Sequence, residues 1–120
     1  MSNSKTEKVY DLEERTFKFA KSAIGYFRKI PKTISNIEIA KQGIRSSGSV
    51  GANFIEANEA LSKKDFIMRI KICRKEAKET IYWAKLSECL EIVTEEKNTI
   101  IREATELMKI FGSIIEKSKS

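Results

Sequence analysis

The sequence has no histidine, one proline, five glycines and two cysteines among 120 residues. Without histidine, histidine-based general base catalysis and histidine metal sites are excluded. So few turn-forming residues argue against a barrel or sandwich of many short strands and favour a few long helices. No apolar run approaches 18 residues, and the first residues lead into no signal-peptide core. We therefore expect a cytoplasmic protein that has no membrane partner.

The two cysteines, Cys73 and Cys89, fall in one expected helix. Sixteen helical residues span about 24 Å, which is too far for a disulfide within one chain. Glu76 and Glu79 have the spacing of two metal ligands, but a di-metal site in a bundle also needs Glu-x-x-His motifs. We therefore expect no catalytic residue, no metal and no cofactor, and a protein that is not an enzyme.

Hydrophobic periodicity and helix-capping patterns predict four helices, near residues 11–29, 35–59, 63–92 and 95–117. Asp11, Ser35 and Ser62 each precede an acidic residue three positions later, and Thr94 precedes two glutamates. Short connections between amphipathic helices favour antiparallel neighbours. The sequence thus predicts an all-α, antiparallel up-down four-helix bundle, with residues 1–120 forming a single domain.

The net charge of +6 is concentrated on the first and third expected helices. An excess of positive charge favours nucleic acid or another acidic surface as a partner. In the third helix four lysines repeat every seven residues, and basic residues of the first helix could extend the same patch. The candidate nucleic-acid-binding residues are Lys64, Lys71, Arg74, Lys75, Lys78, Lys85, Lys18, Lys21 and Arg28. The alternative is a solvated face that keeps the bundle soluble.

The third helix also has a second apolar side, which a monomeric bundle does not need. Ile72, Trp83 and Leu86 lie on it, with Glu76 and Glu79 beside them. An apolar second face that includes a tryptophan is typical of a protein interface. This side predicts self-association, and the alternative is a helix buried centrally in its own bundle.

The second helix combines small residues with a polar row. A stripe of isoleucine, alanine and glycine is expected to face the core, where the glycines would allow close packing. Its members are Ile37, Ala40, Ile44, Gly48, Gly51 and Ile55. On the far side, Arg45, Ser49, Asn53 and Glu56 are neighbours along the helix. That row is either an ordinary solvated face or a polar strip across a subunit contact.

The chain resembles the bacterial four-helix-bundle protein family at these polar residues, at Phe66 and in the segment from Arg74 to Trp83. The family is also called the 23S rRNA intervening-sequence proteins, and it includes relatives of the accessory variability protein of diversity-generating retroelements. The resemblance covers about residues 10–115. It implies a cytoplasmic homopentameric ring of antiparallel four-helix protomers without enzymatic activity. The departures are Ala57, where the family often has glycine, and the Gly48 and Gly51 pair.

For the retroelement relatives, the resemblance also implies that basic surfaces bind nucleic acid and a reverse transcriptase. Two function hypotheses follow from the residues and the resemblance together. The first is a homo-oligomeric bundle, a pentamer by resemblance, that binds RNA or DNA backbones without sequence preference. The second is a protein-only assembly module whose basic residues keep it soluble.

Overall fold

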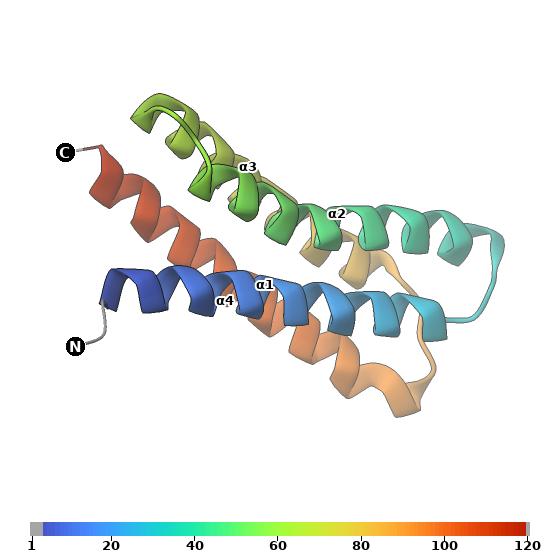
Figure 1. The fold of residues 1–120 in the computed structure, drawn as a ribbon. Coiled ribbons are helices and arrows are strands. Elements are labelled where there is room, and N and C mark those ends of the chain that lie inside the picture. Colours follow the sequence, from blue (N-terminus) through green and yellow to red (C-terminus); the bar gives the residue numbers. More distant parts are fainter. Residues whose placement is uncertain (1–3, 120) are drawn as a thin grey trace.

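The computed structural model describes residues 4–119, with side chains from residue 11 onward, and it contains helices but no strand in this range (Figure 1). The elements are α1 (Ser4–Lys29), α2 (Ile34–Asn58), α3 (Lys63–Leu86), the 3₁₀ turn η1 (Glu91–Val93) and α4 (Thr94–Ser118). The predicted four-helix bundle is confirmed.

The helices run alternately up and down along a molecule of 47 × 29 × 19 Å. α2 packs against both α1 and α3, and α3 packs against α4, whereas α1 and α4 touch over a smaller area. α1 and α3 therefore occupy diagonal corners of the bundle. The α1–α2 and α3–α4 connections lie at one end, opposite the α2–α3 turn (Figure 1).

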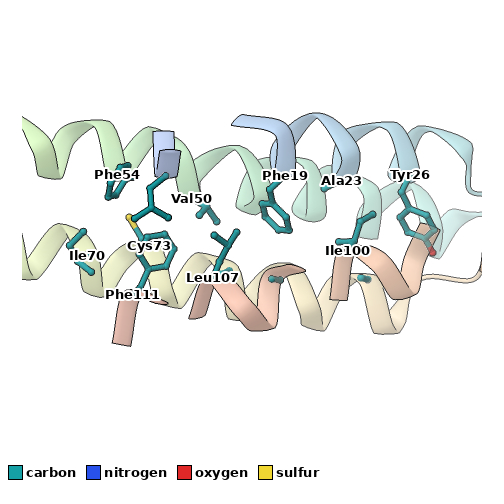
Figure 2. Packing of buried hydrophobic residues seen from close by; sticks show 14 of the residues in the cluster. Phe19, Ala23, Tyr26, Val50, Phe54, Ile70, Cys73, Ile100, Leu107 and Phe111 are labelled. Carbon is teal, nitrogen blue, oxygen red and sulfur yellow. The ribbon is translucent and has the colours of Figure 1, made fainter. Parts of the chain in front are cut away.

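The core is a continuous apolar layer to which all four helices contribute (Figure 2). Phe19, Ala23 and Tyr26 enter it from α1, while Leu107 and Phe111 enter it from α4. Burying one such large side chain contributes about 1.5–3 kcal/mol. The stripes of residues spaced three and four apart on α1 and α4 thus pack inward, as amphipathic helices do.

The predicted helix starts are confirmed only in part. Ser62 caps α3, because its hydroxyl accepts a hydrogen bond from the Asp65 amide at 3.1 Å. The cap of α2 is Thr33 and not Ser35, and it accepts from the Asn36 amide at 3.1 Å. Asp11 is wrong as a start, since α1 begins at Ser4. No glycine or proline interrupts residues 4–10, so the helix continues through the apparent capping pattern.

The third helix ends at Leu86 and not at residue 92, so Cys89 lies outside it. Two sets of tertiary hydrogen bonds hold the chain immediately after the end of α3. The Ser87 hydroxyl pairs with the Tyr26 hydroxyl at 2.6 Å, and the buried side chain of Asn36 holds the backbone of Glu88. Asn36 donates to the Glu88 carbonyl at 2.8 Å and accepts from its amide at 3.0 Å, which ties the two loops together.

The expected core stripe of α2 is wrong by about 100° of helix rotation. Ile37 and Ile55 are 43% and 51% exposed, whereas the buried side carries small residues and three larger ones. The buried residues are Asn36, Gly43, Ser46, Ser47, Val50, Phe54 and Ala57. The close packing predicted at Gly51 is confirmed, because a Cβ there would lie 3.0 Å from the Thr16 hydroxyl, whereas Gly48 faces open space. The closest approach is at Gly43, where a Cβ would overlap the ring of Phe27.

Candidate assembly and nucleic-acid surfaces

The structure brings the two predicted interface sets together on one side of the bundle. This α2/α3 face comprises Arg45, Ser49, Asn53 and Glu56 of α2 and Ile72, Glu76, Glu79, Trp83 and Leu86 of α3. Arg45 links the two helices, because its Nη1 lies 3.3 Å from Glu76 Oε2 and its Nη2 lies 2.6 Å from Glu79 Oε1. The Trp83 indole N–H donates to the same Glu79 oxygen at 3.2 Å. Arg45, one member of the polar row of α2, therefore has its partners on α3.

A second bridge between the helices involves a residue that the sequence reasoning missed. Arg69 donates from Nη1 to Asn53 Oδ1 at 3.0 Å, and the Asn53 amide donates to the Ser49 carbonyl at 2.9 Å. Arg69 precedes Glu76 by seven residues, a spacing that returns to the same side of a helix. That spacing was the available signal for Arg69. Glu56 is exposed at the far end of the row.

Glu76 is the most unusual charged group on this face. It is 7% exposed, and its Oε1 is buried without a hydrogen-bond partner in the described part of the chain. Burial, and then its neighbour Glu79, raise the pKa of Glu76 above its ordinary value despite Arg45. Burial also opposes ionisation of Glu79, but hydrogen bonds from Trp83 and Arg45 outweigh it and lower the pKa of Glu79. The guanidinium of Arg45 thus pairs with two carboxylates.

The apolar part of the α2/α3 face is only partly covered by its own chain. Ile72 and Trp83 are half-buried, and Leu86 and the neighbouring Met68 are 46% and 50% exposed. Tyr82 stands edge-on to Trp83, with ring centroids 5.0 Å apart. α3 is therefore not buried centrally in the protomer. An exposed aromatic and aliphatic strip beside a polar network has the composition of a protein interface.

The predicted basic residues of α3 lie on the outward side of that helix, and we call them the α3 basic row. All six are exposed, and none has a carboxylate within 4.0 Å among the residues that the structure describes. The row consists of Lys64, Lys71, Arg74, Lys75, Lys78 and Lys85. Its positive potential is therefore not cancelled locally by acidic partners.

The basic residues of α1 do not extend this row. Lys18 pairs with Glu14 at 3.2 Å, Lys21 lies 5.7 Å from the centre of the Phe17 ring, and Arg28 is exposed. Because α1 and α3 occupy diagonal corners and these side chains point outward, the two groups lie on opposite sides of the bundle. The single continuous patch expected from sequence is thus two separate basic surfaces.

The described residues offer little for metal or thiol chemistry. No group of three or more acidic, cysteine or histidine side chains among them could hold a metal ion. Burial raises the pKa of the Cys73 thiol to about 12, and Cys73 lies in the core. Within residues 4–119, no helix combines the length and apolar character that crossing a membrane would require.

Comparisons with known proteins place the chain in a family. A family model described as 23S rRNA-intervening sequence protein matches residues 8–113. A crystal structure of a protein of unknown function, from the S23 ribosomal protein family of Bacteroides thetaiotaomicron, is 31% identical in sequence. That match covers 86% of this chain and 96% of the other, with a TM-score of 0.74. No curated protein matches. The chain belongs to the 23S rRNA-intervening sequence protein family.

Proposed function

We propose that this chain is a non-enzymatic, cytoplasmic bundle that assembles with copies of itself into a pentamer and binds nucleic acid without sequence preference. The observation that carries nucleic-acid binding is the α3 basic row, with six exposed cations and no acidic partner among the described residues. Lys64 and Lys85 are separated by about 32 Å of helix. Cations along such a length can follow a phosphate backbone and release its counterions.

Self-assembly is supported by the α2/α3 face. Its apolar strip is incompletely covered by its own chain. A second copy would cover the strip. A ring would also multiply the α3 basic row. Several weak phosphate-binding rows on one particle bind with an avidity that a single row lacks.

The absence of enzymatic activity is supported by the chemistry of the side chains. The sequence contains no histidine, so serine and cysteine nucleophiles have no imidazole base. Cys73 is buried in the core with a raised pKa, and Arg45 holds the paired carboxylates of Glu76 and Glu79 in a network. These groups are better explained as structural elements than as a catalytic site.

The test is a gel shift with structured RNA and with duplex DNA across a salt series. The double variant Lys71→Glu with Lys78→Glu should bind more weakly, and the slope of log affinity against log salt should fall by about 0.7–0.9 for each lost phosphate contact. The matched control is Lys109→Glu with Lys119→Glu, which makes the same change in net charge. In the structure these two lysines pair with Glu106 and Glu116 at 3.4 and 3.1 Å.

Equal weakening by the two double variants would show that net charge alone is responsible and would refute the assigned surface. Absence of any shift in the wild type at low salt would refute nucleic-acid binding. A pentamer that shows no shift would instead support the protein-only assembly module.

A further inference from the structure

A groove of about 430 Å³ lies open between the end of α1 and the beginning of α2. Ile37, Ala40 and Ile44, on the side of α2 that sequence reasoning assigned to the core, form its floor together with Phe27. Arg28, Lys32 and Lys41 form its rim, and no acidic residue lines it. Lys41 pairs with Glu38 at 3.4 Å, whereas Arg28 and Lys32 have no acidic partner among the described residues.

This α1/α2 groove lies at the same height along the bundle as Trp83. α2 and α3 are antiparallel, and their contacts fix the register: Arg45 meets Glu79, and Asn36 meets the backbone of Glu88. The segment of α2 between these positions lines the groove, and the segment of α3 between them carries Trp83 and Leu86. Two copies placed side by side with their axes parallel would therefore bring the groove of one copy opposite Trp83 and Leu86 of the other.

We propose that the α1/α2 groove receives Trp83 and Leu86 of a second copy of this chain, so that the copies associate head to tail. This inference rests on the proposed self-assembly and names the surface that the α2/α3 face meets. Leu86 is 46% exposed and Trp83 is half-buried, and together they supply an apolar contact surface, which we call the projection. The groove supplies an apolar floor. Glu79, whose side chain is 28% exposed and accepts from the Trp83 indole, offers a carboxylate to the basic rim.

The positions of the two surfaces explain why such contacts would close into a ring. Both surfaces include α2, so they lie on adjacent sides of the bundle, at roughly a right angle to each other. A head-to-tail contact between opposite sides would extend into a filament. A contact between adjacent sides rotates each copy relative to the previous one, so that the series of copies can close into a ring. The interior angle of a ring of five is about 108°, which is close to the angle between adjacent sides of the bundle.

The experiment mixes two variants, one with a disrupted groove and one with a disrupted projection. Ile37→Glu places an acid in the groove at a side chain that is already 43% exposed, and Trp83→Ala removes the projection. Leu86→Glu is a second projection variant, at a 46% exposed position, in case Trp83→Ala fails to fold. Leu61→Glu, at a fully exposed residue in the α2–α3 turn, is the matched control. Circular dichroism checks the folding of each variant.

Each surface variant alone should have the 13.7 kDa mass of a protomer by light scattering, while Leu61→Glu should match the wild type. Mixing Ile37→Glu with Trp83→Ala should give a heterodimer, because one variant keeps the projection and the other keeps the groove. Trp83 is the only tryptophan, so its emission in the Ile37→Glu variant should shift to the blue when the groove of the partner covers it.

Three results would overturn the proposal. If Ile37→Glu assembles like the wild type while Leu86→Glu does not, the α2/α3 face pairs with something other than the groove, and self-assembly itself still stands. A mixture that forms no heterodimer excludes the head-to-tail contact. A wild-type protein that is monomeric at micromolar concentration removes both this inference and the proposed self-assembly.

Discussion

Replacing Gly43 with alanine tests the tightest helix contact in the bundle. A Cβ at this position would overlap three atoms of the Phe27 ring. Phe27 is 2% exposed, and its ring packs edge-on against Tyr26 with centroids 5.2 Å apart. The Tyr26 hydroxyl is itself fixed by its 2.6 Å hydrogen bond to Ser87. The ring therefore has little room to move away, and α1 and α2 must separate to admit the methyl group.

Two opposing terms set the size of the effect. Alanine gains about 1 kcal/mol over glycine in helix propensity. Overpacking a filled core typically costs about 1–3 kcal/mol, and an overlap with three ring atoms belongs at the upper end of that range. We expect a net loss of about 2 kcal/mol in the free energy of unfolding. For a chain of this length the loss corresponds to a Tm lower by roughly 6–12 °C.

Gly48→Ala is the matched control, because it makes the same change in the same helix at a position where a Cβ meets nothing within 4 Å. It should gain about 0.5–1 kcal/mol from helix propensity. Thermal and urea unfolding followed by circular dichroism measure both values. Combining Gly43→Ala with Phe27→Leu should recover part of the loss through coupling of the two sites. If Gly43→Ala is as stabilising as Gly48→Ala, the described α1–α2 packing is wrong.

Three further predictions concern buried polar and thiol groups. Asn36→Ala should lower the unfolding free energy by about 3 kcal/mol, measured in urea, because it removes the bonds that hold Glu88 and the Pro31 carbonyl; a loss below about 1 kcal/mol would contradict that role. In native protein a thiol reagent should modify half-buried Cys89 and spare Cys73, whose pKa is raised to about 12, and denaturant should expose both; rapid native modification of two thiols would be inconsistent with the core. Because the pKa of Glu76 is raised by folding, its stabilising effect is present below its unfolded pKa and is lost as pH rises through its folded pKa. The stability of Glu76→Gln relative to wild type should therefore rise as the pH increases above the ordinary glutamate pKa of 4.5, and a constant difference would argue against the burial of this carboxylate.

The helices were predictable where large apolar side chains recur at helical spacing, as Leu107 and Phe111 do in α4. The buried side of α2 was not predictable in this way, because Gly43, Ser46 and Ser47 give no hydrophobic signal. They are buried because close packing and the 2.8 Å hydrogen bond between Ser46 and Thr80 suit small residues. Ile37, a strong apolar signal, lies instead on the partly exposed side.

The residues of the α2/α3 face could be found from their helical spacing, but their pairing could not. Spacing places Arg45 on one face of α2 and Glu79 on one face of α3. Only the register between the helices brings the guanidinium within 2.6 Å of the carboxylate. The same limit explains the predicted single basic patch, because sequence does not tell which helices are diagonal.

Light scattering coupled to size-exclusion chromatography tests the central claim, that the α2/α3 face is built to meet further copies of the chain. The wild-type protein should elute with about five times the 13.7 kDa protomer mass, and Leu86→Glu should fold but elute as a protomer. A wild-type mass of 13.7 kDa, or a Leu86→Glu variant that assembles as the wild type does, would contradict the account.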